Sequence, residues 1–241
     1  MKKSLILFIS SCFLISSCKT SVPEKKVTKG IIADKAMVVS ARKEASKIGI
    51  DILKKGGNAF DAMMATELAL AVSYPYAGNI GGGGFMVYRT NEGKIGGLDY
   101  REKAPLASHR DMYLDEDGNI IKNKSTSGAT AVGVPGTIAG VFEAHKKFGS
   151  LTIKEIIQPV IDLANRGIVV TEKQEKRLQK HKKDFFRVNK DTIPLAKTWK
   201  SGDTIKYNAL AKTLTRILKN GRDEFYKGET AKKLASFLQQ E

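Results

Sequence analysis

Two short stretches of the chain carry residues whose types and spacing could do chemistry. The first is Asp99-Tyr100-Arg101-Glu102, which places an arginine where a strand is expected to end. The planar guanidinium of Arg101 could donate two parallel hydrogen bonds to a carboxylate. The alternative is an ion pair with a neighbouring acid at the end of the strand. From the local sequence alone, we favour this alternative.

The second stretch is the glycine run Gly81-Gly82-Gly83-Gly84. Loops of this kind can bring their backbone N–H groups close to a phosphate. A phosphate loop needs a Lys and a Ser or Thr directly after the glycines, but Phe85-Met86 follows here, and the dinucleotide pattern needs a strand before and a helix after. We therefore interpret the run as a tight packing turn against a buried helix.

Other site chemistries find little support in the sequence. The three histidines, His109, His145 and His181, are far apart in sequence and form no metal-binding pattern, so we assign no metal and no cofactor. The Gly-x-Ser-x-Gly elbow of serine hydrolases is absent. The two cysteines, Cys12 and Cys18, both lie near the N-terminus, so the rest of the chain has neither a thiol nucleophile nor a disulfide.

Residues 1–17 have the pattern of a secretory signal. Lys2 and Lys3 precede an apolar run that is too short to span a bilayer, and Ile15-Ser16-Ser17-Cys18 resembles a bacterial lipobox. We predict cleavage before Cys18, acylation of that cysteine, and an exported protein anchored to a bacterial membrane, with the outer membrane favoured. The alternative is an ordinary cleaved signal with an incidental cysteine. Residues 18–35 then form a tether, and residues 36–241 the folded part.

The 241 residues are 41% hydrophobic and 27% charged, which fits a globular chain and excludes a collagen, a coiled coil or a fully disordered chain. The net charge of +16 could attract nucleic acid, but export makes that partner unsuitable, so we expect none. Anionic lipid headgroups fit better. Mixed signs at helical spacing in 172–190 favour the simplest interpretation, solvated helix faces.

Apolar periodicity and capping residues predict alternating helices and strands, hence an α/β (α+β) chain. A short strand is expected at 36–40, and a hairpin at 85–90 and 94–100. The helix at 59–72 is apolar nearly all round, with only Asp61 and Glu67 charged, so it should be buried. The remaining predicted helices span residues 44–55, 137–148, 152–166, 208–220 and 229–240.

Four segments, in this order, resemble the gamma-glutamyltransferase family. They are Gly56-Gly57-Asn58-Ala59-Phe60-Asp61-Ala62, Gly78-Asn79-Ile80-Gly81-Gly82-Gly83-Gly84-Phe85-Met86, Asp99-Tyr100-Arg101-Glu102-Lys103-Ala104-Pro105 and Ala131-Val132-Gly133-Val134-Pro135-Gly136-Thr137. The resemblance implies an Ntn-hydrolase, a four-layer αββα sandwich that is incomplete here. It also implies that 36–241 is the N-terminal part of a large subunit.

Members of this family are made as a precursor that cuts itself into a large and a small subunit. The new N-terminal threonine attacks the γ-glutamyl carbonyl of glutathione or a related amide, and the γ-glutamyl group then passes to water or to an amino acid. The resemblance assigns the α-carboxylate of the substrate to Arg101, with support from Glu102, and makes Gly81, Gly82, Gly83 and Gly84 a structural loop beside that site.

The family's Thr-Thr-His-x-Ser segment, which carries the nucleophile, does not occur in the 241 residues. We therefore expect the nucleophile to lie C-terminal of Glu241 and this chain alone to be inactive, with the small subunit of the same precursor as its partner. Two alternatives remain at this stage. One is a β-lactam (glutaryl) acylase of the same superfamily, and the other is a non-catalytic lipoprotein remnant.

Overall fold

The computed structural model describes residues 30–189 and 193–240. The chain divides into two compact units, Met1–Lys35 and Ala36–Glu241. In the first unit, residues 30–35 are exposed and bend at Asp34 and Lys35. The predicted signal segment 1–17 and the predicted lipidation residue Cys18 lie outside the described residues.

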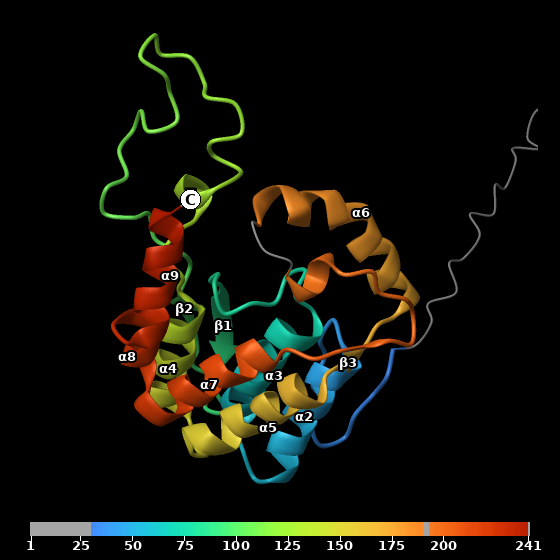
Figure 1. The fold of residues 1–241 in the computed structure, drawn as a ribbon. Helices are drawn as coiled ribbons and strands as arrows, with labels where there is room; N and C mark the ends of the chain where they lie inside the picture. The colour runs from blue at the N-terminus through green and yellow to red at the C-terminus, as the bar shows by residue number, and fades with distance from the viewer. Residues whose placement is uncertain (1–29, 190–192, 241) are drawn as a thin grey trace, which may run out of the picture. The chain divides into compact units, whose positions relative to one another are not determined.

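The second unit is mainly helical (Figure 1). Its α-helices and strands, in chain order, are α2 (Lys43–Lys54), α3 (Ala59–Ser73), β1 (Phe85–Arg89), β2 (Ile95–Asp99), α4 (Thr137–Phe148), α5 (Ile153–Arg166), β3 (Ile168–Val169), α6 (Glu172–Val188), β4 (Thr204–Ile205), α7 (Asn208–Asn220), α8 (Arg222–Tyr226) and α9 (Glu229–Gln239). Two short 3-10 helices, η2 (Ala129–Ala131) and η3 (Pro194–Ala196), complete the set.

Helix α3 is the buried helix that the sequence predicts. Its small side chains, such as Ala65 and Ala69, are fully buried and allow α2 and α5 to pack closely against it. Asn58 begins the helix with a capping box: its side chain accepts from the N–H groups of Phe60 and Asp61, and the Asp61 carboxylate accepts from Asn58 N. These bonds satisfy N–H groups at the start of the helix that have no partner within it.

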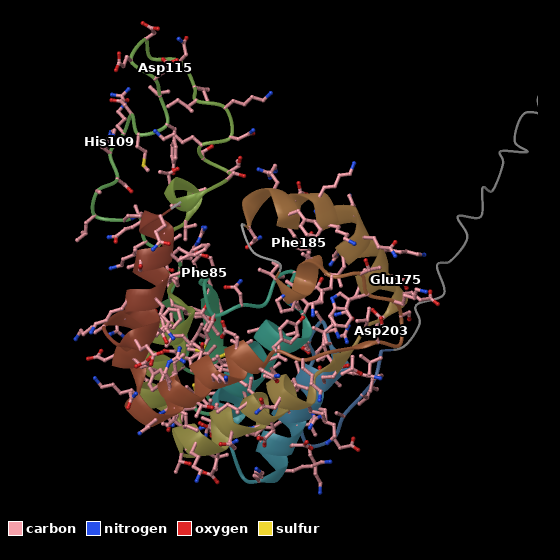
Figure 2. The ribbon with its side chains drawn as sticks, in the orientation of Figure 1. Phe85, His109, Asp115, Glu175, Phe185 and Asp203 are labelled. Atoms are coloured by element: carbon pink, nitrogen blue, oxygen red, sulfur yellow. The ribbon has the colours of Figure 1, made fainter. Side chains whose placement is uncertain are left out.

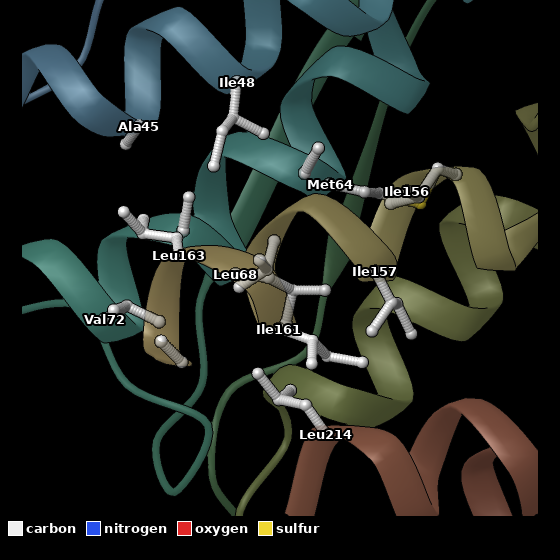
Figure 3. Packing of buried hydrophobic residues seen from close by; sticks show 14 of the residues in the cluster. Ala45, Ile48, Met64, Leu68, Val72, Ile156, Ile157, Ile161, Leu163 and Leu214 are labelled. Carbon is white, nitrogen blue, oxygen red and sulfur yellow. The ribbon is translucent and has the colours of Figure 1, made fainter. Parts of the chain in front are cut away.

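Helix α5 supplies the apolar stripe that joins α3 to α7. Its apolar stripe is buried except for the half-buried Ile153, and Thr152 and Glu155 form a capping box at its start. Figure 3 shows Leu68 of α3, Ile161 of α5 and Leu214 of α7 in this core. Fully burying one aliphatic side chain of this size contributes about 1.5–3 kcal/mol, so the stripe is a major source of the stability of the second unit.

Strands β1 and β2 form the predicted hairpin. Compared with the predicted ranges 85–90 and 94–100, β1 ends one residue earlier, and β2 is one residue shorter at each end. They pair antiparallel from Phe85 opposite Asp99 to Arg89 opposite Ile95. Gly93 has a φ of 84°, which the turn requires and which glycine adopts without steric cost. The other edge of β1 is not paired with any described strand, and Val87 on this strand is 83% exposed.

The predicted strand at 36–40 is wrong: these residues carry no strand assignment. Val39, within this segment, is 80% exposed. The reason is physical, because a strand exists only through a hydrogen-bonded partner, and no described segment lies in register beside 36–40. Helix α8 and the two-residue pair β3–β4 are elements that the sequence analysis did not predict.

Helix α6 spans residues 172–188 of the charged segment 172–190 and confirms the expected exposed helix over that part, since none of its described side chains is fully buried. Thr171 and Gln174 form its capping box. Two side-chain contacts fasten it to the turn before β4, where Glu175 accepts from Ser201 N at 2.8 Å and Lys182 donates to Thr198 at 2.6 Å. Figure 2 labels Glu175 and Asp203 at this junction.

Residues 104–133 form a long excursion between β2 and α4, which runs away from the helices in Figure 1. An antiparallel bridge closes its base, with Lys103 N donating to Val134 O at 3.1 Å and Val134 N to Lys103 O at 2.8 Å. Within the described part of the chain, every helix is too short or too polar to cross a membrane.

Candidate substrate-binding site

The backbone around Arg101 is held by the hairpin and by the glycine run together. Directly beyond β2, Tyr100 N donates to Gly84 O at 3.0 Å and Gly84 N donates to Tyr100 O at 3.3 Å. Arg101 N donates to the Asp99 carboxylate at 3.0 Å. These bonds extend the strand pairing by one residue pair. They fix the backbone position from which the Arg101 side chain projects.

The glycine run contacts residues 100 and 101, and not the buried helix as the sequence analysis proposed. A Cβ at Gly83 would lie 2.6 Å from Tyr100 O and 2.7 Å from Arg101 Cα, and one at Gly84 would lie 2.8 Å from the Tyr100 ring. A Cβ at Gly81 would meet nothing within 4 Å. The glycine that does contact α3 is Gly78, just before the run. Close backbone approach is therefore required at Gly83 and Gly84.

The segment that starts α4 approaches the same point from the other side. Gly82 O accepts from Gly136 N at 2.6 Å and from Thr137 N at 3.0 Å. A Cβ at Gly136 would collide with Tyr100 O, and one at Gly140 would collide with the Tyr100 ring. Three of the four motif segments of the sequence therefore converge around Tyr100 and Arg101, although more than 50 residues separate the first from the last.

The side chain of Arg101 is 64% exposed and makes one ion pair in the described structure, with Glu102 at 3.7 Å. The guanidinium also stands 5.7 Å from the centroid of the Phe85 ring. The ion pair at the strand end is thus present, but an exposed pair at this distance contributes little to stability. The guanidinium keeps its geometry for a bidentate contact with a carboxylate and lies open to a ligand.

The sequence analysis missed one residue of this region, Glu67 of α3. The hydroxyl of Tyr100 donates to its carboxylate, at 3.0 Å from Oε2 and 3.2 Å from Oε1. Burial raises the pKa of Glu67, and the hydrogen bond from Tyr100 lowers it in part. Burial, together with the Glu67 charge, also raises the pKa of Tyr100. The available signal was a carboxylate on a helix predicted to be buried, because such a group requires a partner.

A groove of about 710 Å³ lies between residues 36–40 and β1. Its walls are mostly apolar, and its polar groups include Glu67 and Tyr100. Phe85, whose ring stands under the Arg101 guanidinium, lines the groove and is 62% exposed. Arg101 itself does not line the groove, but its guanidinium lies beside the groove, over the Phe85 ring and next in sequence to Tyr100. Among residues 30–189 and 193–240, no cluster of three or more His, Cys, Asp or Glu side chains is arranged to hold a metal ion.

Solved structures define the class of fold. The chain is similar to gamma-glutamyltranspeptidase from Helicobacter pylori, with a TM-score of 0.82 and 35% identity over 88% of this chain and 62% of that one. It is similar to the enzyme from Pseudomonas nitroreducens complexed with L-DON, with a TM-score of 0.81 and 45% identity over 87% of this chain and 62% of that one. These are Ntn-hydrolases, so the expected fold class is confirmed.

The family follows from the sequence match. A gamma-glutamyltranspeptidase family profile covers residues 45–241, and the chain belongs to this family. It is 47% identical to the glutathione hydrolase proenzyme of Pseudomonas sp., over 86% of this chain and 36% of that protein. It is 38% identical to the glutathione hydrolase proenzyme of Escherichia coli, over 97% of this chain and 42% of that protein. The chain thus spans about two fifths of these curated relatives.

The acylase alternative receives support for the fold alone. A cephalosporin acylase from Bacillus halodurans is similar with a TM-score of 0.70 at 24% identity, over 88% of this chain and 43% of that one. The identity to the gamma-glutamyltranspeptidases is higher, at 35% and 45%. The sequence prediction of family is therefore confirmed, whereas the roles of Arg101, Glu102 and the glycine run stay predictions.

Proposed function

We propose that this chain is the N-terminal part of a glutathione hydrolase proenzyme and that Arg101 binds the α-carboxylate of the γ-glutamyl group. The observation that carries the proposal is the placement of Arg101. Three motif segments fix its backbone, while its guanidinium stays exposed beside the groove. A carboxylate anchored there would hold the γ-carbonyl at a fixed distance, which is how positioning lowers the barrier to attack.

The chemistry of transfer then requires a nucleophile from outside the 241 residues. No Thr-His pair occurs in the sequence. In the proposed reaction, the N-terminal threonine of the small subunit attacks the γ-carbonyl and the amine of the leaving group departs with a proton. Water or an amino acid then releases the γ-glutamyl group from the threonine. Residues 1–241 supply binding and positioning, and by themselves we expect no turnover.

The first experiment reads the source DNA beyond the codon for Glu241. An open frame that reaches a Thr-Thr-His-x-Ser segment supports a self-cleaving enzyme. A stop codon with no downstream partner gene leaves a lipoprotein remnant and removes the catalytic proposal.

The second experiment tests Arg101 in the whole product of that frame, with γ-glutamyl-p-nitroanilide as substrate. Charge-assisted hydrogen bonds contribute about 1.5–3 kcal/mol each, so Arg101→Ala should raise KM at least about tenfold. Arg110 is the matched control, since it is an exposed arginine on the 104–133 excursion, and Arg110→Ala should leave KM within twofold. An unchanged KM in Arg101→Ala would refute the anchor. Faster hydrolysis of a glutaryl amide than of the γ-glutamyl substrate would favour the acylase alternative.

We also propose that the small subunit of the same precursor covers the groove beside β1. Support comes from the edge of β1 that no described strand pairs with, and from Val39 and Val87, which line the groove and are exposed. A hairpin alone is marginally stable, so added strands would stabilise it. Val87→Lys should slow self-cleavage of the whole product, whereas Val169→Lys, on the exposed face of β3, should not. Equal rates for both variants would count against this partner surface.

The membrane anchor is the last part of the proposal. We expect acylation of Cys18 because of the lipobox-like Ile15-Ser16-Ser17-Cys18. When the chain is expressed in a bacterium, the wild type and Cys12→Ala should partition into the detergent phase and incorporate labelled palmitate. Cys18→Ala should do neither. Label in Cys18→Ala, or none in the wild type, would contradict the anchor.

A further inference from the structure

A second cleft, which shares no residue with the groove beside β1, lies beneath α6. It has a volume of about 900 Å³ and is bounded by α6, by residues 74–76 and by the start of α2. Figure 2 labels Phe185 on α6, and this side chain lines the cleft. None of the four motif segments contributes to it. A cleft of this size is in the range of small-molecule sites.

The walls of the cleft are largely aromatic and aliphatic. The larger apolar and aromatic lining residues include Tyr74, Tyr76, Leu178, Phe185, Leu195 and Tyr207. The rings of Tyr74 and Tyr76 meet edge to face at 5.9 Å between centroids. Burial raises the pKa of Tyr207 to about 12, the nearby Arg42 lowering it only in part. These walls suit a flat ring, because aromatic side chains pack well on aromatic ligands.

Arg177 gives the cleft a cation that no carboxylate neutralises within the described residues. Its guanidinium carbon lies 3.6 Å from the centroid of the Tyr76 ring, and Nη1 donates to the Tyr74 hydroxyl at 3.4 Å. The two lining carboxylates are already paired elsewhere, since Glu44 contacts Arg42 at 3.1 Å and Asp184 contacts His181 at 3.3 Å. Tyr74 and Tyr76 thus hold the arginine fork in place while leaving its charge available.

The rim of the cleft adds further positive charge. Lys43 and Lys173 line it and are exposed. The lining therefore holds four basic side chains, Arg42, Lys43, Lys173 and Arg177, against two acidic ones, Glu44 and Asp184. A cleft with an apolar interior and a positive balance favours an organic anion over a neutral or cationic ligand.

We propose that this cleft binds a small aromatic carboxylate, with the carboxylate on Arg177 and the ring among the tyrosines and Phe185. The planar fork of arginine fits a carboxylate in two parallel hydrogen bonds, and its position on Tyr76 pre-organises it for that contact. The site is independent of the proposed γ-glutamyl site, so failure of either proposal leaves the other standing.

The test measures the binding of the probe 2-naphthoate to the purified chain by titration calorimetry. We expect saturable binding of one molecule per chain. The neutral isostere 2-naphthamide should bind at least tenfold more weakly. Arg177→Leu should weaken 2-naphthoate binding at least tenfold, whereas Lys176→Leu, an equal loss of charge at an exposed neighbour on α6, should change it less than twofold.

Thermal unfolding of each variant shows whether it folds. If Arg177→Leu does not fold, Phe185→Ala decides together with the amide comparison, because it removes a wall and leaves the arginine in place. Phe185→Ala should then weaken 2-naphthoate severalfold. The proposal is overturned by an absence of saturable binding to the wild type, by equal affinity for the amide, or by equal effects of Arg177→Leu and Lys176→Leu.

Discussion

The hydroxyl of Tyr100 lies 3.0 Å from Oε2 of Glu67, and this contact joins the end of β2 to the middle of the buried helix α3. Tyr100 also precedes Arg101, and glycines enclose it on both sides. The position of the candidate anchor therefore depends on a carboxylate 34 residues earlier in the chain.

Glu67→Gln should stabilise the chain more at pH 7 than at pH 4. Burial raises the pKa of Glu67 above its ordinary value of 4.5. The folded state then binds a proton that the unfolded state has released, so the contribution of Glu67 to stability is complete below the unfolded pKa and is lost as pH rises through the folded pKa. Glutamine does not titrate. Unfolding in urea at both pH values gives the difference.

Glu92→Gln is the matched control for Glu67→Gln, since Glu92 is exposed in the hairpin turn. Its difference from the wild type should be the same at pH 4 and pH 7. A pH-independent difference for Glu67→Gln as well would show that the buried carboxylate is not the titrating group.

Two substitutions within the glycine run should have opposite outcomes. In Gly83→Ala the new methyl meets the backbone of Tyr100 and Arg101, which cannot move as a flexible side chain can, and overpacking of this kind costs about 1–3 kcal/mol. In Gly81→Ala the methyl meets open space, so the change should stay within about 0.5 kcal/mol. Chemical denaturation measures both. Equal losses would mean that the run is needed for flexibility instead of close approach.

Asp61 joins α3 to the turn before α5 through hydrogen bonds. It is fully buried, and its carboxylate accepts hydrogen bonds from Asn58 N and from the N–H and hydroxyl of Ser150. Asp61→Ala should lower the free energy of unfolding by about 2–4 kcal/mol, because several donors lose a charged acceptor. Asp51→Ala, which breaks an exposed pair with Lys47, should cost about 0.5 kcal/mol or less. Similar losses of unfolding free energy in the two variants would contradict a stabilising role for the Asp61 hydrogen bonds.

Glu224→Gln should cost more stability at pH 7 than at pH 3. Burial raises the pKa of Glu224, but hydrogen bonds from Thr230 and Arg216 outweigh it and the net change is a lowering. Stability from this group is therefore complete above the unfolded pKa and is lost as pH falls through the folded pKa. Thermal unfolding at the two pH values tests this, with Glu143→Gln, in an exposed pair with Lys147, as the control. A greater cost at pH 3 would reverse the assigned sign.

The elements that the sequence predicts well are those whose signals are local. Helix α7 has the predicted bounds because its apolar face repeats every turn and Gly221, with a φ of 73°, ends it. The strand at 36–40 failed because pairing depends on a partner far away in the chain. The two-residue pair β3–β4 was missed for the same reason.

The same distinction between local signals and long-range packing applies to the candidate site. Arg101 and the glycine run are visible as motifs, but the contacts of Gly83 and Gly136 with Tyr100 arise only when three segments meet in space. Arg177 and Tyr76 are 101 residues apart, and their stacking leaves no trace in either local sequence. Local patterns therefore name candidate groups, whereas burial and long-range packing decide which of them share a site.

The bridge between Lys103 and Val134 separates the length of the chain excursion from the geometry at its base. The entropy of closing a loop grows only with the logarithm of its length, so adding or deleting residues inside 104–133 costs little. Descendants of this gene could thus exchange or extend the excursion and acquire new surface contacts, while Arg101 and Gly136 keep their places. Evolution can therefore change the excursion without changing the backbone geometry around Arg101.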